Sequence, residues 1–275
     1  MTKKQHVCID GLNLSLSKGT GIATYARNLG DYLQKTGYSL SILFDKKIND
    51  KFPDVLYEAV FYDALNKASE KERRPRESMV HYFLIPFYFI KSLLYFIRPP
   101  KIKQRSFSGV VENEDMKNKL PTFNTVYNSG SLYRLAQCYF MLFRRLLPIK
   151  LSPTPDIMHW TCPIPIRVVG AKNYYTIHDL IPLRLPYTTQ DNKKFFYDLI
   201  QKIVHSADKL VTVSEFSRHD IINYLSLPEE KVINAYQSIS LHSRSSPDDK
   251  TFFRKSITGS IWLITKKLFS ICWRN

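Results

Sequence analysis

The chain of 275 residues is poor in the features that mark disulfide-rich, metal-binding and hydrolytic proteins. Its four cysteines, Cys8, Cys138, Cys162 and Cys272, lie far apart without a Cys-x-x-Cys pair. This spacing argues against a disulfide framework and favours a reducing cytosol. The seven histidines form no His-x-His or His-x₃-His pair, so no metal is expected. No serine stands in a Gly-x-Ser-x-Gly turn, which argues against a hydrolase of that type.

Acidic residues are also few relative to basic ones. The chain has 40 Lys and Arg against 24 Asp and Glu, a net charge of +16. Such an excess predicts an anionic partner, which could be a membrane surface, nucleic acid or a phosphorylated substrate. Nucleic acid is disfavoured because the sequence has no recognition motif and no aromatic RNP-like strand. The N-terminus has no apolar run, so no secretory signal is expected. The hydrophobic share of 44% is enough for a packed core.

The first segment predicts a strand, a loop, a helix and a second strand. Residues 5–10 are a short apolar run, and residues 11–21 are rich in Gly and Ser. Gly37 is placed to end the helix, and residues 38–44 alternate as a strand. One face of the helix carries apolar residues at helical spacing: Ile22, Tyr25, Ala26, Leu29 and Leu33.

The loop before this helix has the composition of a phosphate site. Lys18, Gly19, Thr20 and Gly21 immediately precede the helix, where free N–H groups and the helix dipole favour an anion. The motif is neither Gly-x-Gly-x-x-Gly nor a Walker loop. A plain tight turn therefore remains the alternative.

Residues 66–150 are expected to form a basic, apolar, helical insertion. Residues 67–105 hold ten Lys and Arg against three Glu, around an aromatic apolar run at 80–97. Three hypotheses remain open for this run: an interfacial helix on an anionic membrane, a pair of core helices broken at Pro86, and a membrane span. Four residues make a span costly: His81, Pro86, Lys91 and Ser92.

The rest of the insertion is predicted as one polar loop and one helix. Residues 106–131 are polar and are expected to form a loop. Residues 132–149 are predicted as a helix, with Arg144 and Arg145 near its C-terminus.

The remaining sequence alternates strands with helices, which predicts a largely parallel α/β sheet. Two helices are expected, 191–207 and 215–225, and Ser214 is suited to cap the second. Residues 161–170 are expected to be a loop. Four apolar runs are predicted as strands: 156–160, 172–178, 208–213 and 231–236. The fold class is therefore Rossmann-like, with a mostly parallel sheet flanked by helices.

Polar side chains gather where two of these strands end. His178 and Asp179 follow one strand, and Ser214 and Arg218 follow the next. Open α/β sheets bind ligands at the carboxyl ends of their strands. The residues alone leave two hypotheses for His178: a group aimed into a cleft, or a strand-end residue hydrogen-bonded to backbone.

Three motifs resemble the N-terminal half of the retaining family 4 glycosyltransferases, which have the GT-B fold. They are GTGIATYARNL at 19–29, HDLIPL at 178–183 and VTVSEFSR at 211–218. The resemblance covers residues 5–45 and 155–240, and it hardly extends to 46–154.

The resemblance implies a role for each of these motifs. His178 would lie beside the transferred sugar, with Asp179 fixing the turn. The backbone of Gly19, Thr20 and Gly21 would face the donor diphosphate. The cleft-facing pair Ser214 and Arg218 would contact phosphate or acceptor, and the planar guanidinium of arginine suits phosphate.

The implied activity is transfer of a hexose from a nucleotide sugar to a lipid-linked or glycan acceptor, in cell-envelope polysaccharide synthesis. It implies no cofactor and no bound metal, since electrostatic contacts support the leaving diphosphate. The protein would be cytoplasmic and peripheral on the inner face of the membrane. The residues alone leave two rivals: a non-catalytic basic protein that binds membrane surfaces, and a single-domain nucleotide-binding enzyme that uses Asp45.

Residues 1–240 would form the acceptor-side lobe of such an enzyme. Nothing after Tyr236 resembles the donor lobe, and residues 241–275 are expected to be a tail outside the family fold. A one-base shift from the codon of Trp262 forces glycine, and permitted codons elsewhere give YGLLQKNYFLYVG from Ile261 onward. This resembles the opening strand of a donor lobe. We therefore hypothesise a frameshift upstream of Ile261; a genuine basic tail that binds membrane is the alternative.

Overall fold

The computed structural model describes residues 4–15, 21–71, 78–107, 109–111, 120–190 and 192–237. The predictions made for Gly19, Thr20 and the tail 241–275 lie outside the described residues.

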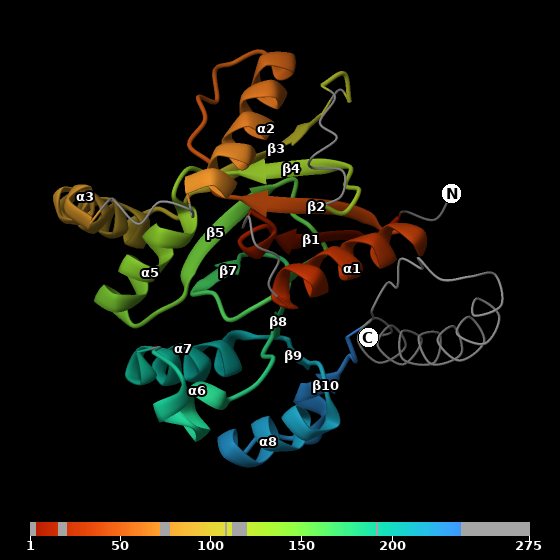
Figure 1. Ribbon diagram of the computed structural model, residues 1–275, viewed down its shortest axis with the longest axis vertical. Helices are drawn as coiled ribbons and strands as arrows, with labels where there is room; N and C mark the ends of the chain where they lie inside the picture. The colour runs from red at the N-terminus through yellow and green to blue at the C-terminus, as the bar shows by residue number, and fades with distance from the viewer. Residues whose placement is uncertain are drawn as a thin grey trace.

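A single ten-stranded sheet forms the centre of the described chain (Figure 1), in the order β10-β9-β8-β6-β1-β2-β4-β3-β5-β7. Strands β10 through β4 in this order are all parallel, and β3 pairs antiparallel with β4. The prediction of a mostly parallel α/β sheet is confirmed. The strands are β1 (His6–Asp10), β2 (Ser39–Phe44), β3 (Lys101–Ser106), β4 (Thr125–Asn128), β5 (Leu147–Ser152), β6 (Ile157–Trp160), β7 (Ile166–Val168), β8 (Lys172–Thr176), β9 (Lys209–Thr212) and β10 (Val232–Asn234).

Helices cover both faces of the sheet, as alternating side chains on the strands require. In β1, Val7 and Ile9 join a core with Leu33 of α1, while Cys8 joins a second core with Ile203 of α7. The α-helices are α1 (Gly21–Lys35), α2 (Asp54–Lys71), α3 (Ser78–Ile97), α5 (Leu132–Phe143), α6 (Ile181–Arg184), α7 (Lys193–Ser206) and α8 (Glu215–Leu225). The short 3₁₀ helices are η1 (Asn13–Ser15), η2 (Pro186–Thr188) and η3 (Glu229–Lys231).

The predicted end of the first helix is confirmed. Gly37 has a φ of 89°, in the region that glycine adopts without a steric penalty. The N–H of Tyr38 then donates to the carbonyl of Leu33 at 3.0 Å, which closes the last turn. The chain consequently turns back at once into β2.

Three predictions between residues 106 and 170 need correction. The expected loop 106–131 contains β4, because Val126 and Tyr127 are buried between β2 and β3 although their flanks are polar. The expected loop 161–170 contains the short strand β7. The helix predicted over 132–149 ends at Phe143, because Arg144 adopts a left-handed conformation with φ 52°, and β5 follows.

The apolar run 80–97 lies in α3, which continues through Pro86 without a break. Phe96 stacks on Phe143 of α5 with ring centroids 4.7 Å apart, so one edge of α3 is attached to the fold (Figure 1). The core hypothesis is wrong for most side chains after Pro86. These are exposed: Phe87, Phe89, Ile90, Leu93, Leu94, Phe96 and Ile97. Within the described ranges, no helix has both the length and the apolar character needed to cross a membrane.

Candidate functional site

The strand order reverses between β1 and β6. The chain passes from β1 through α1 to β2 on one side, whereas β6, β8, β9 and β10 follow one another on the other side. In open α/β sheets, ligands bind at the carboxyl ends of the strands at such a switch point. Asp10 ends β1, and Thr161 follows β6. The candidate site is therefore the group of side chains around these two ends.

Asp10 joins the two strands across this point. Its side chain is fully buried and accepts hydrogen bonds from the N–H of Thr161 at 2.5 Å and of Leu12 at 3.3 Å. Burial raises the pKa of Asp10 to about 6, although the two backbone bonds act in the opposite direction. This carboxyl group therefore titrates close to neutral pH.

A buried tyrosine connects α1 to β6 and β8. The hydroxyl of Tyr25 lies 3.2 Å from Nε2 of His159 and 3.0 Å from the hydroxyl of Thr176. His159 and Thr176 are themselves 2.8 Å apart. Burial lowers the pKa of His159 to about 4, and the nearby His178 adds to the effect. At neutral pH the His159 ring is therefore uncharged and serves as a hydrogen-bonding link.

His178 lies beside this group, half-buried, and edge-on to the Tyr25 ring at 5.3 Å. Its Nε2 is 2.9 Å from the carbonyl oxygen of Thr161. A carbonyl can only accept, so Nε2 carries the hydrogen, and Nδ1 of the neutral ring is an acceptor. Burial lowers the pKa of His178, against the opposing effects of the Thr161 carbonyl and Asp179. The bond to the Thr161 carbonyl agrees with the hypothesis of a strand-end residue hydrogen-bonded to backbone, and a side chain aimed into a cleft stays a prediction.

Asp179 is exposed, and its Oδ1 accepts from the N–H of Ile181 at 2.9 Å. This bond stabilises the turn that begins α6. A direct catalytic role for Asp179 stays a prediction.

Gly21 is the first residue of α1 and is exposed. A Cβ atom at Gly21 would meet nothing within 4 Å, so the described structure does not require glycine there. Its carbonyl accepts from the side-chain amide of Gln237 at 3.0 Å, which brings the start of α1 beside the segment that follows β10. Its contact with a donor phosphate stays a prediction.

Ser214 caps α8, as the sequence predicts. Its hydroxyl accepts from the N–H of Ser217 at 3.0 Å and also bonds to the Ser217 hydroxyl at 3.0 Å. These bonds satisfy donors at the start of the helix. The cap places the serine pair at the carboxyl end of β9.

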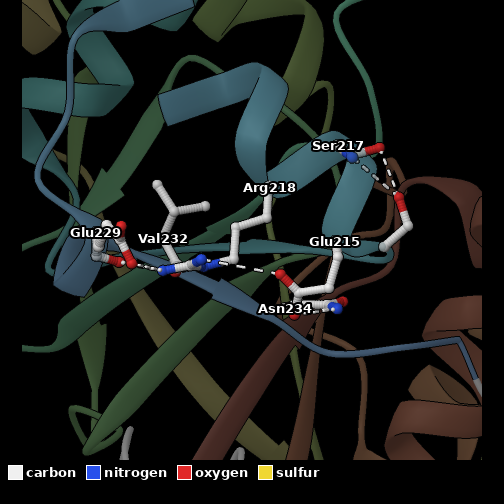
Figure 2. Close-up of polar contacts among 7 residues, drawn as sticks. Glu215, Ser217, Arg218, Glu229, Val232 and Asn234 are labelled. Atoms are coloured by element: carbon white, nitrogen blue, oxygen red, sulfur yellow. Dashed lines mark hydrogen bonds and ion pairs between the residues drawn. The ribbon is translucent and has the colours of Figure 1, made fainter. Parts of the chain in front are cut away.

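Figure 2 shows Arg218 extended between α8 and the chain around β10. Its Nε donates to the carbonyl of Val232 at 3.0 Å, and Nη2 donates to the carbonyl and carboxylate of Glu229, both at 3.2 Å. The carboxylate of Glu215 lies 3.8 Å from Nη1. The described contacts thus give Arg218 a structural role in holding β10, and its contact with phosphate stays a prediction.

Sequence reasoning missed Asp10, Tyr25 and His159 as members of this site. Asp10 was detectable, because a polar residue at the end of the first apolar strand repeats the pattern of His178. His159 interrupts a buried strand, which is a weaker signal. Tyr25 was assigned only to the apolar face of its helix, and nothing in its spacing indicates the hydrogen bonds. No cluster of three or more potential metal ligands occurs among the residues with described positions.

Comparisons of the chain with protein-family models and with curated proteins found no match.

Proposed function

We propose that this chain is the acceptor-side lobe of a family 4-like glycosyltransferase with the GT-B fold. The complete enzyme transfers a hexose from a nucleotide sugar to a lipid-linked or glycan acceptor in cell-envelope polysaccharide synthesis. The observation that carries the proposal is the position of His178 beside the switch point, where Nε2 bonds to the carbonyl of Thr161 and the ring lies edge-on to buried Tyr25. A sugar placed over the carboxyl ends of β1 and β8 would meet this group.

In this proposal some of the motif residues contact the sugar and others contact phosphate. His178 contacts the sugar near the reacting carbon, and the turn held by Asp179 keeps the ring in place. The N-terminus of α1, with Gly19, Thr20 and Gly21, faces the donor diphosphate, and Ser214 with Arg218 lies on the phosphate or acceptor side. The leaving diphosphate is stabilised by such preorganised donors without a bound metal.

The complete enzyme works on the inner face of the cell membrane in this proposal. The support is α3, whose exposed apolar side chains stand beside basic residues such as Lys91 and Arg98. An apolar helix face with cationic flanks lies at the headgroup boundary of an anionic bilayer. The same observation favours the second candidate function, a non-catalytic protein that binds membrane surfaces.

The first prediction concerns turnover. The purified 275-residue chain is expected to transfer no hexose from any nucleotide sugar, because in this proposal it forms only one wall of a two-lobed cleft and does not enclose the transition state. The assay uses radiolabelled nucleotide hexoses and vesicles carrying a polyprenyl diphosphate-linked saccharide. Turnover by this chain alone would show that the single-lobe proposal is wrong.

The proposed function is tested by adding a donor lobe to this chain. The DNA downstream of the last codon is translated in all frames, and a donor lobe found there is joined in frame to this chain. Transfer by the joined protein supports the glycosyltransferase proposal, whereas membrane binding without transfer supports the second candidate. Absence of a donor-lobe sequence in every frame would contradict the frameshift hypothesis.

The second prediction concerns α3. Vesicles of phosphatidylglycerol should bind the chain at low salt, neutral phosphatidylcholine should bind it much less, and high salt should weaken the binding. Leu94→Gln with Ile97→Gln should lower binding to anionic vesicles by about tenfold or more, because each buried apolar side chain contributes about 1.5–3 kcal/mol.

The matched control is Tyr187→Gln with Phe216→Gln, which removes two strongly exposed rings outside α3. This control should bind as the unmodified chain does in cosedimentation. An equal loss in both double variants, or equal binding to both lipids, would contradict the role of α3.

A further inference from the structure

A cavity lies on the same edge of the sheet, away from His178. Its volume is about 1070 Å³, and it is bounded by α3, β3 and the loops that follow β2 and β4. Aromatic side chains of α2 and α3 form part of its wall: Tyr57, Phe87, Tyr88 and Tyr95. The charged residues of the wall are five cations and one acid: Lys47, Lys91, Lys101, Lys103, Arg105 and Asp50.

The fold explains why the cations gather there. Because β3 runs antiparallel to β4, its amino end lies at the carboxyl edge of the parallel strands. Lys101 and Lys103 are two residues apart in β3, so they lie on one side of the strand, and both are exposed. Lys47 comes from the loop after β2, and Lys91 comes from α3.

Only one of the five cations has an acidic partner in the described structure. Arg105 pairs with Asp54 at 3.0 Å and lies 4.3 Å above the ring centroid of Tyr57. Lys91 contacts the rings of Phe87 and Tyr95, each at 5.6 Å from the centroid. The other lysines of the wall form no ion pair among the described residues. Unpaired like charges around one cavity repel one another, and a bound anion offsets that repulsion.

The start of α5 adds to this field. Ser129, Gly130 and Ser131 line the cavity immediately before the helix, and the side chain of Ser131 makes no cap hydrogen bond. The positive end of the helix dipole therefore lies at the cavity wall. The helix dipole adds to the positive potential of the cavity, most of which comes from its unpaired lysines.

We propose that this cavity binds a phosphate-bearing ligand through Lys47, Lys91, Lys101 and Lys103. Each lysine is a compact donor of several hydrogen bonds to phosphate oxygens. The ligand is either a soluble phosphate compound or a lipid headgroup, and the exposed face of α3 beside the cavity gives a headgroup access from a bilayer. Phosphate binding in this cavity does not depend on hexose transfer, so it can be tested without an active enzyme.

The experiment measures pyrophosphate binding to the full chain by calorimetry at low salt. Lys101→Glu with Lys103→Glu should weaken binding by about tenfold or more, because two charge-assisted contacts are replaced by repulsion. The matched control is Lys35→Glu with Lys202→Glu, which makes the same charge change at exposed sites on α1 and α7. The control should stay within about twofold of the unmodified chain.

A second variant covers the case in which the β3 double variant fails to fold. Lys47→Glu lies in the loop after β2 and should weaken pyrophosphate binding without altering the sheet. Absence of pyrophosphate binding, or equal weakening in the cavity and control variants, would overturn the proposal.

The two sources of phosphate are separated with vesicles of phosphatidic acid. A larger loss of vesicle binding in the cavity double variant than in the control supports a lipid headgroup. Cavity-dependent pyrophosphate binding with equal vesicle binding in both double variants supports a soluble phosphate ligand. Both patterns support the site, and neither requires that the chain transfer sugar.

Discussion

His178→Ala is expected to lower kcat by about 10²–10³-fold in an enzyme that joins this chain to a donor lobe, while nucleotide affinity stays nearly unchanged. The reason is position: His178 lies at the switch point beside Tyr25, where the sugar is proposed to bind. Loss of one well-placed polar contact to developing charge has about this effect on rate. Steady-state kinetics give kcat, and calorimetry with the nucleotide gives its affinity.

The matched control is His205→Ala. His205 also bonds to a backbone carbonyl, with Nδ1 at 2.6 Å from the oxygen of Gln201, but it is exposed on α7. This variant should keep the unmodified kcat. His178→Gln retains a donor for the Thr161 carbonyl and should recover the stability lost in His178→Ala, without recovering the rate.

A structural role for His178 gives a different result. The single hydrogen bond to Thr161 should contribute about 1 kcal/mol to the free energy of unfolding of the 275-residue chain, measured in urea. If His178→Ala unfolds the chain, or if kcat falls only in proportion to the folded fraction, His178 serves the fold and the catalytic hypothesis is wrong.

The sequence predicted the parallel part of the sheet well because those strands follow simple rules. The runs at β1, β2, β6, β8 and β9 are apolar and largely buried, and the helices α1 and α7 beside them have a clear 3.6-residue period. The helix ends were equally predictable. Gly37 follows α1 with a positive φ, and the side chain of Ser214 caps the start of α8. In each of these cases neighbouring residues contain the information.

The antiparallel extension was not predictable in the same way. β4 has only two buried residues, Val126 and Tyr127, and it becomes a strand because β2 and β3 pair with it. The helix before β5 ends at the left-handed Arg144, whereas the breaker in the sequence, Pro148, lies further on, inside the strand. Tertiary pairing overrides local preference in such segments.

The site likewise combines residues that local sequence indicates with contacts that only the tertiary structure shows. The strand ends indicated His178 and Ser214, yet the two partners of His178 are Tyr25 and Thr161, which lie more than a hundred positions apart in sequence. Asp10 bonds to Thr161 across 151 positions, and no local pattern contains that contact. The cavity lined by Lys101 and Lys103 likewise depends on the reversed direction of β3, which the sequence did not predict.

The free energy of unfolding is expected to respond to pH in opposite directions at Asp10 and His159. Asp10 has a pKa of about 6 when folded, against about 3.9 when unfolded. The folded state therefore binds the proton more tightly, and stability falls as pH rises from about 4 to about 6. The two pKa values differ by about 2 units, which corresponds to about 3 kcal/mol.

His159 acts in the other direction over nearly the same range. Its pKa is about 4 when folded and about 6.5 when unfolded, so the unfolded state binds the proton more tightly. Stability from this group therefore rises with pH across this window, again by about 3 kcal/mol. The lowered pKa of His178 adds in the same sense. In the unmodified chain the contributions of Asp10 and His159 largely cancel.

Single substitutions should separate the two contributions. Asp10→Asn removes the falling contribution, so the unmodified chain should lose about 3 kcal/mol relative to this variant between about pH 4 and about pH 7. Asparagine keeps one oxygen for the N–H of Thr161 but loses the second acceptor, which lowers stability by a constant amount at every pH. His159→Gln removes the rising contribution, and its difference from the unmodified chain should have the opposite slope.

Urea unfolding at a series of pH values measures both differences. The double variant Asp10→Asn with His159→Gln should resemble the unmodified chain in its pH dependence, because both contributions are then absent. A flat difference for Asp10→Asn would mean that Asp10 ionises in the folded state as it does in water. The hydrogen bonds from the N–H groups of Thr161 and Leu12 would then offset the effect of burial, and the raised pKa of Asp10 would be contradicted.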